Sequence, residues 1–65
     1  MSEDSKESVR KGNGNLADAF DSLEQASRRF KQAGDGKTAE RIEKIKVEVD
    51  KVSTEVSEKL RPNNS

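Results

Sequence analysis

The chain contains no cysteine, histidine, tyrosine or tryptophan, and it has only two phenylalanines and one proline. Without cysteine there is no disulfide framework and no thiolate nucleophile. Without histidine the commonest general base is missing, and so is a common zinc ligand. We therefore expect no catalytic residue, no metal site and no cofactor, and we predict a protein that is not an enzyme.

Long hydrophobic runs are also lacking. No apolar run exceeds two residues, and the N-terminal "MSEDSKESVRK" has no apolar stretch of the kind found in signal peptides. We expect a cytoplasmic protein with no membrane partner. Charged residues make up 40% of the 65 residues and apolar residues 28%, a balance typical of coiled coils and solvated helices.

The first 14 residues are polar, with Val9 as their one large apolar side chain after Met1. "GNGN" at 12–15 adds two glycines, which disfavour a helix. We interpret residues 1–14 as a flexible N-terminal arm. Asn15 is a suitable N-cap, so a first helix is predicted over about residues 16–33.

An apolar stripe runs along this first predicted helix. Its members recur at spacings of four, three, four and three, which places them on one helical face: Leu16, Phe20, Leu23, Ser27 and Phe30. Ser27 is polar in the middle of the stripe. It is expected either at a small-residue contact with its hydroxyl bonded to its own helix, or as a polar group that fixes register.

A second stripe follows over about residues 37–61. In heptad notation, position a holds Ile42, Val49 and Val56, position d holds Ile45 and Val52, and Leu60 extends the pattern. Charged residues interrupt at helical rather than alternating positions, so we predict a helix and not a strand. Pro62 ends it, and residues 62–65 are expected to form a disordered tail.

The sequence "AGDGKT" at 33–38 ends like a phosphate-binding loop. That loop requires a glycine five residues before Gly36, where this chain has Lys31, and it should follow a strand rather than a helix. A turn explains the residues better, because Gly34 can end one helix and Asp35 can cap the next. We therefore predict an all-α fold: a two-helix antiparallel, coiled-coil-like hairpin over residues 15–61 with its turn at 34–36.

The predicted hairpin leaves apolar surface uncovered. With the turn at Asp35, Leu16 lies near Thr54, so Val56 and Leu60 should extend beyond the first helix and leave an overhang. Charge also differs along the hairpin: residues 28–46 hold seven basic and three acidic side chains, whereas residues 1–27 hold three and six. Two hairpins side by side in opposite directions would pair these ends, so we predict a homodimer that forms an antiparallel four-helix bundle.

The first functional hypothesis is a small protein-interaction module with a regulatory role, acting by self-association or by docking on another protein through the overhang. Its association interface comprises Leu16, Phe20, Leu23, Phe30, Ile42, Ile45, Val49, Val52, Val56 and Leu60.

The alternative is nucleic-acid binding through the basic region near the turn, since the architecture resembles that of the Rop-like hairpin-dimer RNA binders. The phosphate contacts would come from the basic residues of this region, Arg28, Arg29, Lys31, Lys37, Arg41, Lys44 and Lys46, and the resemblance is one of architecture alone, without a matching motif. Balanced net charge and two Phe residues placed inside the stripe argue against this alternative.

Overall fold

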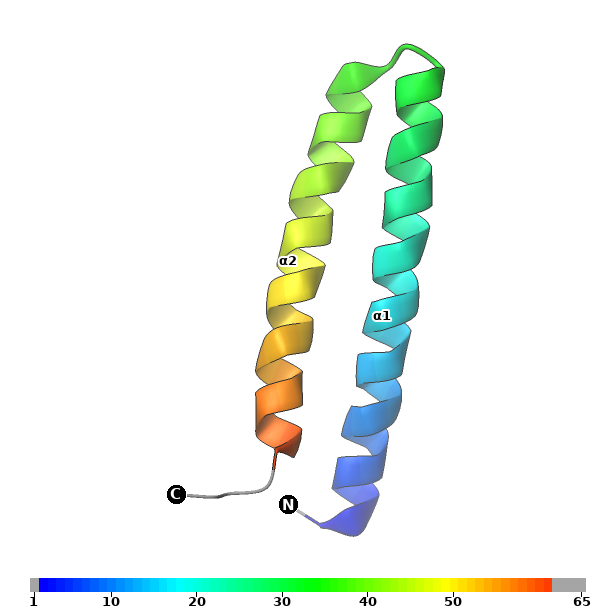
Figure 1. Ribbon diagram of the computed structural model, residues 1–65. Coiled ribbons are helices and arrows are strands. Elements are labelled where there is room, and N and C mark those ends of the chain that lie inside the picture. The colour runs from blue at the N-terminus through cyan, green and yellow to red at the C-terminus, as the bar shows by residue number, and fades with distance from the viewer. Residues whose placement is uncertain (1, 62–65) are drawn as a thin grey trace.

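The computed structural model describes residues 2–61, which form two antiparallel helices joined by a short turn at one end of the molecule (Figure 1). Helix α1 spans Glu3–Gln32 and helix α2 spans Gly36–Leu60. This arrangement confirms the predicted all-α helical hairpin. The expected C-terminal tail at 62–65, including Pro62, lies outside the described residues.

Helix α1 begins at Glu3, so residues 3–14 are helical where the sequence interpretation expected a flexible arm over 1–14, and Asn15 lies inside the helix rather than at its N-cap; Met1 lies outside the described residues. Ser2 is the N-cap: its hydroxyl accepts the Ser5 N–H at 3.1 Å. Glu3 and Asp4 place negative charge in the first turn, where the helix dipole favours it. Each of the two glycines lowers helix propensity by about 1 kcal/mol relative to alanine, and contacts with α2 offset this cost.

The turn between the helices follows a regular capping scheme. The Asp35 N–H donates to the Phe30 carbonyl at 2.8 Å and the Gly34 N–H to that of Lys31 at 3.0 Å, a Schellman motif. Gly34 has a φ of 81°, which the motif requires and which glycine adopts without strain. Asp35 then caps α2 by accepting the Thr38 N–H at 3.1 Å. Every residue of this loop is thus explained by helix termination and capping.

The hairpin is a layer one helix thick. Its extents are 47 × 22 × 11 Å, and the shortest of these is about the diameter of a single helix. Within residues 2–61, Ser27 and Ala39 are the buried ones, each 1% exposed. The other residues at the contact between the helices are covered on one side by the neighbouring helix and are exposed to solvent on the other. A two-helix layer therefore leaves one side of every apolar stripe uncovered.

Candidate association surface

The seam between the helices follows a heptad-like spacing on both sides. On α1 a row of residues withdrawn from solvent recurs every three or four positions from the N-terminal turns onward: Lys6, Val9, Asn13, Leu16, Phe20, Leu23 and Ser27. On α2 the corresponding row is Ala39, Ile42, Lys46, Val49, Ser53, Val56 and Leu60. Glu24, Ala26, Thr38 and Glu43 flank these rows and are also partly covered. The α2 seam therefore uses the predicted a positions but replaces the predicted d positions with their neighbours.

This shift leaves large apolar side chains outside the hairpin. Ile45 and Val52, assigned to position d from the sequence, are 51% and 43% exposed. The residues that follow them, Lys46 and Ser53, lie against α1 instead. A rotation of about 100° per residue separates each exposed residue from its neighbour in the seam. Ile45 and Val52 consequently lie at one edge of the seam and form a row seven residues apart.

Phe30 belongs to the same side of the hairpin. Both helices are right-handed and run in opposite directions, so moving one residue back from the seam turns α1 and α2 toward the same face. Phe30, which is 39% exposed, lies seven residues after Leu23 at this edge of α1. We call the surface formed by Phe30, Ile45 and Val52 the open face. It holds three of the four large apolar residues that are exposed in the described part of the chain, the fourth being Val47.

The opposite face carries polar contacts between the helices. Near the open end of the hairpin, which is the end away from the turn, Ser53 Oγ donates to Asn13 Oδ1 at 2.8 Å, and Asn13 Nδ2 donates to Ser57 Oγ at 3.2 Å. Nearer the turn, Lys46 Nζ lies 3.6 Å from Glu24. These contacts join residues from both helices, so they fix the hairpin register from the side opposite the open face.

Lys46 is the centre of this polar face. Its side chain is 15% exposed, and its ammonium lies 3.2 Å from Glu43 and 5.3 Å from the centroid of the Phe20 ring. The aliphatic stem of a lysine can cover apolar surface while its charge meets carboxylates, and the ring face attracts the cation. Lys46 therefore closes this face in the position where a coiled coil would place an apolar residue.

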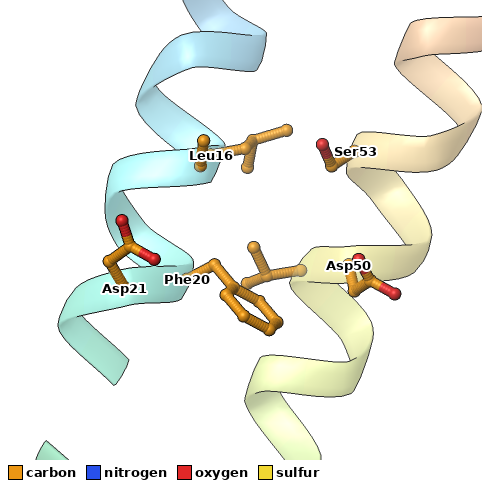
Figure 2. Close-up of a pocket in the computed structure, with 7 residues that line it drawn as sticks. Leu16, Phe20, Asp21, Asp50 and Ser53 are labelled. Atoms are coloured by element: carbon orange, nitrogen blue, oxygen red, sulfur yellow. The ribbon is translucent and has the colours of Figure 1, made fainter. Parts of the chain in front are cut away.

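A groove of about 210 Å³ lies between the helices on the polar face (Figure 2). Leu16 and Phe20 of α1 point toward α2 and form its apolar wall, while Asp21 and Asp50 stand at its rim. Ser53, already bonded to Asn13, completes the side on α2. The groove is partly open to solvent, so the hairpin alone does not fully close around its own seam.

Ser27 and Ala39 are the two buried residues of the seam in the described part of the chain, and they lie near the turn. Both are small and buried, and the Ser27 hydroxyl makes no hydrogen bond of standard geometry. The expectation that this hydroxyl bonds to its own helix was therefore wrong. It lies beside the Glu43 carboxylate instead and favours its ionised form; this hydroxyl and then Lys46 lower the pKa of Glu43 below its usual 4.5.

The residues predicted for the association interface separate into two groups. Those held partly within the seam are Leu16, Phe20, Leu23, Ile42, Val49, Val56 and Leu60. Phe30, Ile45 and Val52 form the open face. The expected overhang is absent, because α1 has 30 residues, α2 has 25, and Asn13 bonds to Ser57 near the end of α2. Val56 and Leu60 are covered in part by the turns of α1 that the sequence interpretation assigned to an arm.

The basic residues proposed for nucleic-acid contacts have different surroundings in the structure. Lys46 is engaged inside the hairpin, and Arg28 Nη2 lies 3.8 Å from Glu24. The other five remain on exposed positions of the two helices: Arg29, Lys31, Lys37, Arg41 and Lys44. Arg28 and Arg29 also border a shallow groove on α1 with Gln25 and Gln32.

Comparison of the chain with protein-family models, curated proteins and solved structures finds no match. Within residues 2–61 the structure gathers no group of three or more side chains suited to hold a metal ion. In the same range, neither helix combines the length and apolar character that crossing a bilayer requires. The open face is thus the feature from which a function can be argued.

Proposed function

We propose that this protein is a small helical-hairpin interaction module that self-associates through its open face into a homodimeric, antiparallel four-helix bundle. The observation that carries the proposal is the position of Ile45 and Val52, which lie half-exposed at heptad spacing in the middle of α2. A monomeric helix normally carries charge at such positions, whereas a helix between two neighbours carries apolar residues on two edges.

The thickness of the hairpin supports this proposal. A layer 11 Å thick has no second layer against which its apolar stripe can be buried, and stable domains contain at least two packed layers. A second hairpin placed on the open face would supply that layer. It would cover Phe30, Ile45 and Val52 and add to the burial of seam residues on that side such as Leu23, which one hairpin covers only in part.

The distribution of charge supports opposite orientations for the two hairpins. The turn end is basic and the open end is acidic, as the counts for residues 28–46 and 1–27 show. Surface charges contribute only about 0.2–1 kcal/mol per pair, but they discriminate between packings of similar apolar area. Antiparallel hairpins bring the basic end of one beside the acidic end of the other.

The mass in solution tests the proposal. By light scattering we expect the native protein at twice its 7.2 kDa chain mass. Ile45→Asp places a charge in the proposed interface and should shift the protein toward 7.2 kDa. Val47→Asp is the matched control, because Val47 is 53% exposed and lies away from both the seam and the open face. A native protein at 7.2 kDa, or an Ile45→Asp variant as dimeric as Val47→Asp, would refute the proposal.

A further inference from the structure

Small residues form a second row on the open face, parallel to that of Ile45 and Val52. At intervals of seven along α1 and its C-cap stand Ser5, Gly12, Ala19, Ala26 and Ala33. This row lies next to the exposed edge of α1 that bears Phe30. A Cβ built on Gly12 meets no atom within 4 Å, so packing within the hairpin does not require a glycine there. Small side chains allow another helix backbone to approach closely.

We call the row from Ser5 to Ala33 on α1 the small row and the row of Ile45 and Val52 on α2 the large row. The two rows are centred at the same level along the long axis of the hairpin. Asn13 bonds to Ser53 and Ser57, and Glu24 pairs with Lys46, so Ala19 lies level with about Val49 and Asp50. Ala19 is the middle member of the small row. Val49 and Asp50 lie between Ile45 and Val52, the two members of the large row. The two rows therefore share one centre to within about half a helical turn.

A shared centre is what a two-fold axis requires. A two-fold rotation that stacks two hairpins face to face with their turns at opposite ends places α1 on the partner's α1 and α2 on the partner's α2. Each row then meets its own copy in reverse order. One two-fold axis can pair both rows with their copies only if the centres of the two rows lie at the same level along the hairpin. The register between α1 and α2 meets this condition.

We infer that the partner on the open face is a second copy of this chain, related by a two-fold axis that passes beside Ala19. The inference rests on the self-association proposed above and specifies its geometry. Ala19 meets the partner's Ala19, and Gly12 meets the partner's Ala26. Ile45 meets the partner's Val52, so two apolar contacts flank the axis symmetrically. Close approach along the small row brings the larger side chains of α2 into contact with those of the partner's α2.

Charge complementarity on the flank of α2 supports the same geometry. Arg41 and Glu55 are exposed, and neither belongs to an ion pair in the described part of the hairpin. Because Ile45 lies opposite the partner's Val52, Arg41 lies opposite the partner's Val56 and next to the partner's Glu55. With the turns at the same end, Arg41 would instead lie level with the basic turn end of the partner's α1, which carries Arg29. Like charges disfavour that arrangement.

Disulfide trapping tests the position of the axis, since the native chain has no cysteine. Ala19→Cys should form a homodimeric disulfide under mild oxidation because its Cβ approaches that of its symmetry mate. Ala17→Cys is the matched control: Ala17 lines the groove on the polar face and faces away from the partner. We expect Ala19→Cys to cross-link at least about tenfold faster than Ala17→Cys, and Gly12→Cys mixed with Ala26→Cys to form the mixed disulfide.

Charge exchange gives an independent measurement. Arg41→Glu alone and Glu55→Arg alone should each raise the dimer Kd by about tenfold, and the double variant should recover near-native association. If the reduced protein is dimeric but Ala19→Cys cross-links no faster than Ala17→Cys, this geometry is wrong and self-association stands. The same conclusion follows if the charge exchange fails to recover association. If the native protein is monomeric, both inferences fall together.

Discussion

Asn13 bonds to Ser53 and Ser57 across the hairpin, at 2.8 and 3.2 Å, and so joins the N-terminal third of α1 to the last turns of α2. This contact explains why a stretch containing two glycines is helical. Asn13 occupies a seam position four residues after Val9 and three before Leu16. Its amide donates and accepts, and the two serines of α2 supply the matching groups.

Asn13→Ala should lower the free energy of unfolding by about 1–2 kcal/mol, since two cross-helix hydrogen bonds are lost and alanine recovers part of the cost through its helix propensity. Urea unfolding followed by circular dichroism measures the change. Asn15→Ala is the control, because Asn15 is exposed in the same helix and off the seam. It should be neutral or slightly stabilising. Equal effects of the two substitutions would contradict the role given to Asn13.

Gly14 offers a complementary prediction. It is helical and exposed, and a Cβ added there meets no atom within 4 Å. Gly14→Ala should therefore stabilise the protein by about 0.4–1 kcal/mol by restricting the unfolded chain. The Tm in thermal denaturation should rise. A fall in Tm would show that residues 3–14 are not helical in solution.

Lys46 should contribute through both its charge and its stem. Lys46→Met keeps the apolar stem against Phe20 but removes the pairs with Glu24 and Glu43, at an expected cost of about 0.5–1 kcal/mol. Lys46→Ala should cost more because packing is lost as well. Lys51→Met is the control, since Lys51 pairs with Glu48 at 3.6 Å on an exposed surface. In chemical denaturation we expect the largest loss of stability for Lys46→Ala, a smaller loss for Lys46→Met and the smallest for Lys51→Met. An equal loss for Lys51→Met and Lys46→Met would refute the role given to Lys46.

Acidification should destabilise the hairpin in a defined range. The hydrogen bonds from Thr38 lower the pKa of Asp35 below its usual 3.8, and the Ser27 hydroxyl and Lys46 lower the pKa of Glu43 below 4.5. Because both folded-state pKa values are depressed, their stabilisation is present above the ordinary values and is lost as pH falls through the lowered ones. The Tm should therefore decrease below about pH 4.5.

Asp35→Asn separates the two contributions to this acid sensitivity. Asparagine retains an oxygen that can cap α2 but does not titrate, so the variant should keep a well-formed α2 at neutral pH. Its Tm should depend less on pH below about 3.8, the ordinary pKa of an aspartate, than that of the native protein. An unchanged acid profile would show that the Asp35 cap does not contribute to it.

The sequence was sufficient to predict the hairpin, but the first helix was predicted to begin at about residue 16 whereas α1 begins at Glu3. The spacing from Leu16 to Phe30 and from Ile42 to Leu60 predicted two helices, and Gly34 and Asp35 predicted the turn. The same three-and-four spacing continues backward through Asn13 and Val9. That signal was present in the sequence, but the two glycines beside Asn13 and its polar side chain pointed to a loop.

The rotation of α2 could not be read from its sequence. An apolar pattern alone favours Ile45 and Val52 in the seam, and nothing in that pattern indicates that Lys46 and Ser53 would take their place. The choice depends on partners in α1: Glu24 and Phe20 receive Lys46, and Asn13 receives Ser53. These are tertiary contacts between residues more than 20 positions apart, so single-helix periodicity does not contain them.

Sedimentation equilibrium combined with circular dichroism over a dilution series tests the central claim that one hairpin cannot bury its own apolar surface. We predict a mass of twice 7.2 kDa at high concentration, with helicity and Tm that fall together on dilution. A 7.2 kDa species that melts cooperatively at a concentration-independent Tm would contradict the claim.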